Sequence, residues 1–166
     1  KTKLVFLANP NNPTGTWMCG QELGELATKL DSHGILLVLD YAYWEYVTEK
    51  TIMDPVKMRK KHPNVVVLKT FSKIYGLAGL RLGYLIADPI VTAMIERSRQ
   101  PFNVNSCALA AGAAAITADD FIKRSRHANE SGLNQLVVGL RELNVEVYPK
   151  NLKSQCNFIL MDFKKP

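Results

Sequence analysis

Residues 70–81 have the sequence Thr70-Phe71-Ser72-Lys73-Ile74-Tyr75-Gly76-Leu77-Ala78-Gly79-Leu80-Arg81, and they follow an apolar run, Val65-Val66-Val67-Leu68. The length and β-branched content of that run predict a fully buried strand. Lys73 is therefore expected just beyond the carboxyl end of a strand. Open α/β sheets bind ligands outside the carboxyl ends of their strands, so residues 70–81 are expected to contribute to a binding site. The hydroxyl groups, the lysine and the arginine in this stretch are suited to binding phosphate.

Two earlier apolar runs, Leu4-Val5-Phe6-Leu7-Ala8 and Ile35-Leu36-Leu37-Val38-Leu39, have the same character. Near-continuous apolar runs are typical of parallel strands that are covered on both faces. Each run ends in polar residues, and the carboxyl ends of parallel strands lie at one edge of the sheet. We therefore expect one site at that edge, lined by Asn12, Asp40, Tyr43 and Lys73.

Arg81 stands at the start of the next apolar run, residues 82–87, and not at its end. The link formed by residues 74–80 is short and rich in glycine, whereas a parallel crossover needs about a dozen residues or more. The strand at 82–87 is therefore expected to run antiparallel to its neighbour. Its first residue then lies at the same edge as the last residues of the other strands. This topology predicts that Arg81 lies beside Thr70, Ser72 and Lys73.

These residue types match the chemistry of pyridoxal phosphate (PLP), whose ring accepts electrons from the substrate carbon after an amine substrate has displaced a lysine. Lys73 is the candidate for that lysine, and once released it would move a proton between the substrate carbon and the cofactor. Asp40 is the candidate partner of the ring nitrogen, because a facing carboxylate favours the protonated form of that nitrogen.

The ring oxygen and the phosphate of PLP also have candidate partners. Tyr43 reaches the site if a short helical turn follows the preceding strand, and with Asn12 it would hydrogen-bond the ring oxygen. Arg81 would bind the phosphate through its planar guanidinium group, with additional donors from the hydroxyl groups of Thr70 and Ser72.

Each of these residues has a commoner explanation when it is taken alone. A lysine after a strand is usually a surface residue, and an aspartate such as Asp40 often caps a helix or a turn. Tyr43 fits equally well into an aromatic cluster with its neighbours. The glycines after Lys73 do not form a P-loop, since no Gly-Lys-Ser/Thr follows them. The cofactor hypothesis therefore depends on the whole set sharing one edge of the sheet.

Three motifs follow one another along the chain: Asn12-Pro13-Thr14-Gly15, then Asp40 with Tyr43, then Ser72-Lys73 with Arg81. Their order and spacing resemble those of the fold-type I PLP-dependent aminotransferases, and most closely the histidinol-phosphate aminotransferase family. In that family the matching residues bind the cofactor. Residues 76–81, 100–105 and 156–160 are also similar to segments of the family, while Tyr41 stands where an acidic residue is common.

The resemblance implies transamination of L-histidinol phosphate with 2-oxoglutarate, which yields imidazole-acetol phosphate and glutamate in histidine biosynthesis. It also implies a cytoplasmic homodimer whose partners are a small-molecule amino donor and a 2-oxo acid acceptor. Close relatives leave two alternatives open, an aromatic amino-acid aminotransferase and a threonine-phosphate decarboxylase-like enzyme. An alternative of another class is a non-catalytic aminotransferase-like ligand-binding domain of a regulator.

The expected fold is α/β, with a three-layer PLP-transferase large domain whose mostly parallel sheet has one antiparallel strand. Residues 1–118 are expected to belong to this large domain, and residues 119–166 to a connecting helix and the start of a small α+β domain. At 166 residues the chain resembles the central portion of a longer enzyme. The residues that bind the substrate carboxylate and phosphate are therefore expected outside it, and the fragment is expected to be inactive alone. Further helices are expected at 21–33, 54–62, 89–99, 106–117 and 119–143, and small-domain strands at 145–148 and 157–163.

The remaining signals point to no metal, nucleic-acid or membrane partner. The net charge of +6 is explained by solvated basic helix faces. Cys19, Cys107 and Cys156 are odd in number and widely spaced, which argues against a disulfide framework or a zinc site and fits a reducing compartment. The histidines lack metal-ligand spacing, and no apolar stretch predicts a membrane span.

Overall fold

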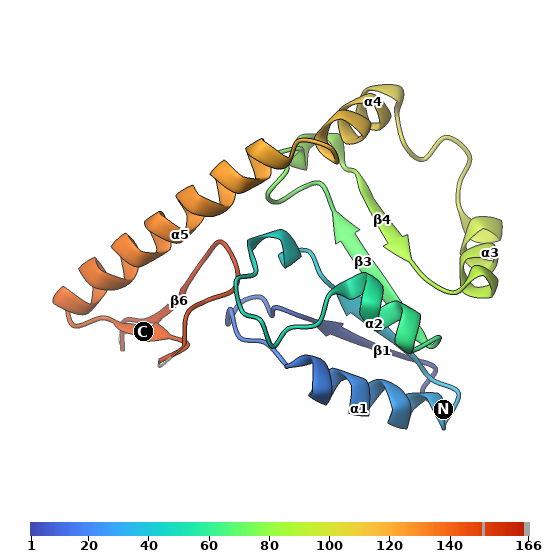
Figure 1. Ribbon diagram of the computed structural model, residues 1–166, viewed down its shortest axis with the longest axis horizontal. Helices are drawn as coiled ribbons and strands as arrows, with labels where there is room; N and C mark the ends of the chain where they lie inside the picture. Colours follow the sequence, from blue (N-terminus) through green and yellow to red (C-terminus); the bar gives the residue numbers. More distant parts are fainter. Residues whose placement is uncertain (151, 165–166) are drawn as a thin grey trace.

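The computed structural model describes residues 1–150 and 152–164 of the chain. A four-stranded sheet runs through its first part in the order β1-β2-β3-β4 (Figure 1). The first three strands are parallel, and β4 pairs antiparallel with β3. The strands are β1 (Leu4–Ala8), β2 (Leu36–Asp40), β3 (Val65–Thr70) and β4 (Gly83–Ile86). The prediction of a mostly parallel α/β sheet with one antiparallel strand is confirmed.

Two helices, α1 (Gly20–Asp31) and α2 (Pro55–Lys61), cover one face of this sheet. Alternate side chains of the strands point to that face, because successive residues of a strand face opposite sides. Leu37 and Leu39 of β2 and Val65 and Val67 of β3 are completely buried there against both helices. Asp54 begins α2 by accepting a hydrogen bond from the backbone N–H of Lys57 at 2.9 Å.

The opposite face of the sheet is apolar and is flanked by α3 (Pro89–Ser98). Side chains of all four strands and of α3 line a groove of about 490 Å³ on this side. Phe6 in β1 is 69% exposed, so this face is less completely covered than the one under α1 and α2. Asp88 begins α3 by accepting from the backbone N–H of Ile90 at 3.0 Å.

The second part of the chain extends from α4 (Ser106–Ala115) through the long helix α5 (Asp119–Glu142) to a two-stranded antiparallel sheet (Figure 1). That sheet consists of β5 (Glu146–Tyr148) and β6 (Leu160–Asp162). Strand β6 is shorter than the strand expected at 157–163, because residues 155–158 pack on loops of the first part instead of pairing with β5. The expected domain boundary at residue 118 falls between α4 and α5, and it stays a prediction.

Candidate cofactor site at the sheet edge

Five of the seven predicted site residues line one pocket at the carboxyl edge of the parallel strands. The pocket has a volume of about 330 Å³, and its lining includes Asp40, Thr70, Ser72, Lys73 and Arg81. Asp40 is the last residue of β2 and Thr70 the last residue of β3, while Arg81 lies just before β4. The antiparallel direction of β4 therefore brings the arginine to the lysine, as the short link between them predicts.

The other two predicted residues, Asn12 and Tyr43, come from the loops after β1 and β2 and bind each other. Asn12 Nδ2 donates a hydrogen bond to Tyr43 Oη at 3.0 Å. The Lys73 ammonium group lies over the Tyr43 ring, 5.2 Å from its centroid, which joins this pair to the pocket. Because the tyrosine oxygen accepts from Asn12, its own hydroxyl proton can be donated to a ligand.

A short 3₁₀ turn, η1 (Trp44–Tyr46), follows directly on Tyr43. The backbone N–H of Trp44 donates to the carbonyl oxygen of Tyr41 at 3.1 Å, so Tyr43 lies in a turn directly after β2, and its role in the site stays a prediction. The Asp40 carboxylate accepts from the backbone N–H of Ala42 at 3.0 Å, which shapes the start of the loop. The Asp40 side chain is otherwise exposed at the pocket and keeps further acceptor capacity for a protonated ring nitrogen.

The hydroxyl group of Thr70 shapes the turn that carries the lysine. It accepts from the backbone N–H of Ser72 at 3.0 Å and contacts the carbonyl oxygen of Leu82 at 3.5 Å. Thr70 is thus partly used in fixing the backbone between β3 and Lys73. Ser72, one turn residue further on, also lines the pocket.

Arg81 adopts a left-handed backbone conformation, with φ 53° and ψ 49°, at the end of the 3₁₀ turn η2 (Ala78–Leu80). Such a conformation costs a residue with a Cβ about 1–3 kcal/mol, and strain of this kind is concentrated at functional sites. Arg81 Nη1 donates to the carbonyl oxygen of Ala78 at 2.9 Å, which holds the side chain against its own turn. The remaining N–H groups of the guanidinium stay available for an anion.

Lys69, which was not predicted as a site residue, also lines this pocket. Its ammonium group forms an ion pair with Glu45 of η1, and the two side chains are only 4% and 11% exposed. Burial lowers the pKa of Lys69, and the carboxylate of Glu45 acts in the opposite direction. Arg126 Nε of α5 donates to the backbone oxygen of Glu45 at 2.7 Å, so the long helix is hydrogen-bonded to η1, which carries Glu45. The sequence does contain a pattern that could have identified Lys69 as a buried residue. It follows Val65 and Val67 at alternate positions of β3, and such positions share one face of a strand.

The donor set fits PLP in its chemistry. It offers a carboxylate at Asp40, an amine at Lys73 and a guanidinium at Arg81, each at the same edge, with hydroxyl and amide donors between them. Among the residues described, no group of three or more His, Cys, Asp or Glu side chains is placed to hold a metal ion. No helix within residues 1–150 and 152–164 is long and apolar enough to cross a membrane.

Cys156 lies beside this site, and it is expected to react with alkylating reagents much more slowly than Cys107. Burial raises the pKa of the Cys156 thiol to about 12, although the charge of Lys73 acts in the opposite direction, so the thiol stays protonated near pH 8. Cys107 is exposed. Timed iodoacetamide labelling followed by peptide mass spectrometry should give a rate at least ~10-fold higher for Cys107. Equal rates would show that the chain around Cys156 does not stay packed against the site.

The sequence matches one protein family over its full length. The model of the aminotransferase class I and II family matches residues 1–166. Among curated proteins, the chain is 46% identical over 162 residues to histidinol-phosphate aminotransferase 2 of Pseudomonas fluorescens, and the match covers 98% of the chain but 42% of that protein. The chain thus spans less than half the length of the curated relatives that it resembles.

Solved structures show the same fold. A histidinol-phosphate aminotransferase from Sinorhizobium meliloti in complex with pyridoxal-5'-phosphate has a TM-score of 0.88 and 31% identity, covering 98% of this chain and 42% of that one. L-threonine-O-3-phosphate decarboxylase from Porphyromonas gingivalis has a TM-score of 0.84 and 27% identity, covering 99% of this chain and 48% of that one.

Proposed function

Because the chain belongs to the aminotransferase class I and II family, we propose that it forms the cofactor-binding part of a PLP-dependent aminotransferase. The observation that carries this proposal is the meeting of Asp40, Lys73 and Arg81 in one pocket, with Tyr43 beside the lysine. Bound PLP supplies a ring that accepts electrons from the substrate carbon. The remaining tasks fall to side chains of this chain.

Lys73 would attach the cofactor covalently and then move a proton at the substrate carbon. The Lys73 amine lies 5.2 Å from the centroid of the Tyr43 ring, a contact that would keep it close to the pocket after release. Asp40 would hold a proton on the ring nitrogen by pairing with it, which favours the electron-accepting form. Two groups of residues complete the site: Tyr43 and Asn12 would donate hydrogen bonds to the ring oxygen, and Arg81, Ser72 and Thr70 would bind the phosphate.

We propose L-histidinol phosphate as the amino donor and 2-oxoglutarate as the acceptor, giving imidazole-acetol phosphate and glutamate in histidine biosynthesis. The support is the 46% identity to a curated histidinol-phosphate aminotransferase. Among solved structures the identity is 31% to a histidinol-phosphate aminotransferase and 27% to the threonine-phosphate decarboxylase. A cytoplasmic homodimer and a division into large and small domains near residue 118 belong to the same proposal. Their support is the resemblance of the motifs to that family.

The substrate proposal is tested with the whole protein and PLP. Histidinol phosphate, phenylalanine and threonine phosphate are each offered with 2-oxoglutarate, and glutamate formation is measured. We expect kcat/KM for histidinol phosphate to exceed that for phenylalanine by at least ~100-fold, because a site built to pair with a phosphate rejects a donor that lacks it. Threonine phosphate tests the alternative chemistry, since release of carbon dioxide from it would indicate a decarboxylase. A protein that binds PLP but turns over none of the three would favour the regulator alternative.

A further inference from the structure

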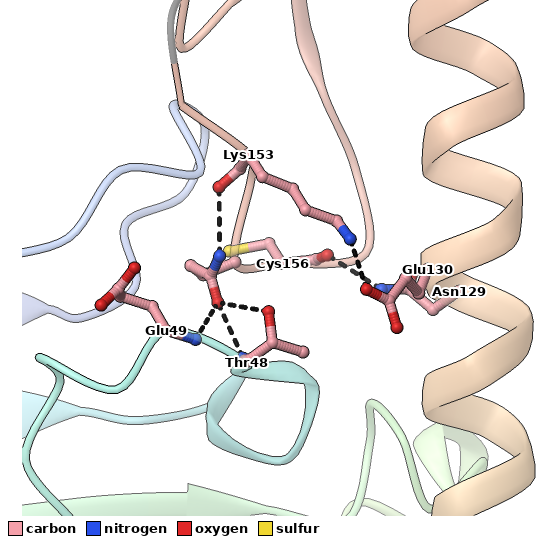
Figure 2. Close-up of polar contacts among 7 residues, drawn as sticks. Thr48, Glu49, Asn129, Glu130, Lys153 and Cys156 are labelled. Carbon is pink, nitrogen blue, oxygen red and sulfur yellow. Dashed lines mark hydrogen bonds and ion pairs between the residues drawn. The ribbon is translucent and has the colours of Figure 1, made fainter.

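Residues 154–158, which we call the strap, lie far from the pocket in sequence but pack against two of its loops. The strap stands between β5 and β6, in the second part of the chain. One loop, residues 9–15, carries Asn12, and the other, residues 41–49, carries Tyr43. Figure 2 shows Cys156 of the strap lying between α5 and the loop that contains Thr48 and Glu49.

The strap approaches the first loop at Gly15. The backbone N–H of Gln155 donates to the carbonyl oxygen of Gly15 at 3.1 Å. A β-carbon at Gly15 would lie 2.3 Å from Ser154 Oγ and 3.3 Å from Ser154 Cα, and the backbone there has a φ of 68°. Any other residue at this position would therefore be strained in its backbone and would also push the strap away. The glycine of the Asn-Pro-Thr-Gly motif thus serves the docking of the strap.

The second loop is held by the side chain of Gln155, which is 4% exposed. Its Oε1 accepts from the backbone N–H groups of Thr48 at 2.8 Å and Glu49 at 2.9 Å, and its Nε2 donates to the carbonyl oxygen of Lys153 at 3.2 Å. On the other side, Asn129 Nδ2 of α5 donates to the carbonyl oxygen of Cys156 at 3.1 Å (Figure 2). The strap is thus fixed to the second loop and to the long helix at once.

Phe158, the last strap residue, reaches the candidate site itself. Its ring packs edge to face against the Tyr43 ring, with 5.3 Å between the centroids and 84° between the planes. Tyr43 in turn accepts from Asn12 and lies under the Lys73 ammonium group. The tyrosine ring is therefore in direct contact with a residue that is 115 positions further along the chain.

We propose that the strap is a positioning element of the cofactor site, in which Phe158 sets the direction of the Tyr43 hydroxyl and Gln155 and Gly15 hold the two loops together. The inference rests on the proposed PLP function. A hydrogen bond from Tyr43 to the ring oxygen would favour the bound cofactor in which that oxygen is ionised. The midpoint, which is the pH at which the visible absorption change is half complete, would therefore be lower. A tyrosine that turns away loses this effect, and the midpoint rises.

The test uses the whole protein with PLP and the variants Phe158→Leu, Gly15→Ala and Phe158→Tyr. The midpoint is expected to rise by about half to one pH unit in the first two, because each weakens a contact that orients Tyr43. Phe158→Tyr, which keeps the ring, should stay near the wild-type value. None of the variants changes a charged group at the pocket, so a shift of the midpoint would not come from a changed charge. These groups are Asp40, Glu45, Lys69, Lys73 and Arg81.

Phe163→Leu is the matched control, because Phe163 is a phenylalanine of the same region that is 61% exposed. Its midpoint should equal that of the wild type. If every variant binds PLP with the wild-type midpoint, the strap proposal is wrong while the cofactor function stands. If the wild type itself binds no PLP, the proposed function fails and the strap proposal fails with it.

A second measurement needs only the wild-type protein. If the docked strap favours cofactor binding, then bound PLP must favour the docked strap by the same factor. PLP should therefore slow the alkylation of Cys156 by at least about 5-fold while leaving the rate at Cys19, outside the strap, within about 2-fold. An unchanged rate at Cys156 in the presence of bound PLP would contradict the proposal.

Discussion

Replacing Lys73 with alanine in the whole protein is expected to lower kcat by about 10⁴-fold or more, because the covalent attachment of the cofactor and the proton transfer are both lost. Lys73 lines the pocket with Asp40 and Arg81, and its ammonium group lies over Tyr43. The wild-type protein with PLP should show a visible absorption band that borohydride removes, because reduction of the carbon–nitrogen double bond to a single bond would leave the cofactor permanently attached to the lysine. In the alanine variant no cofactor should remain attached after reduction, although PLP can still bind through its phosphate.

Lys73→Arg is the matched control, since it keeps the positive charge over Tyr43 but cannot make the covalent link. It should behave like the alanine variant in the borohydride experiment and keep more of the non-covalent affinity for PLP. Peptide mapping of the reduced wild-type protein decides between the two lysines of the pocket. Attachment at Lys69 instead of Lys73 would overturn the assignment.

Replacing Lys69 with methionine is expected to lower the free energy of unfolding by about 3–5 kcal/mol, because Glu45 is then left buried without its partner. The pair is nearly enclosed, with side chains 4% and 11% exposed, and it ties η1 to β3. The measurement is urea unfolding of the protein without PLP, followed by circular dichroism. Because methionine is similar in length to lysine, most of the loss reflects the charge and not a cavity.

Two comparisons separate this effect from a general loss of packing. The double variant Lys69→Met with Glu45→Leu should recover most of the lost stability, since neither charge then remains buried. Lys153→Met breaks an ion pair with Glu130 in which the two side chains are 38% and 42% exposed. It should change the free energy of unfolding by less than ~1 kcal/mol. A double variant that is no more stable than Lys69→Met would refute the buried-charge explanation.

Much of the fold could be predicted from local patterns. The apolar runs gave the four main strands to within a residue or two, and the short link 74–80 gave the antiparallel direction of β4. The shared edge then followed, and the structure brings Asp40 and Arg81 into the same pocket as Lys73. These inferences succeed because the spacing of apolar residues reports which faces of one element are buried, and because parallel strands must end at a common edge.

The sequence alone thus predicted the strands, the antiparallel direction of β4, the edge of the sheet and the residue types expected there. The order of the strands, the pairing of Lys69 with Glu45, and the hydrogen bonds of Gln155 to the backbone of Thr48 and Glu49, 107 and 106 residues away in sequence, were visible only in the folded chain. Buried polar groups must find partners, but the local sequence does not say which distant segment supplies them. That choice depends on how separate elements pack against one another, and here it brings Phe158 to Tyr43.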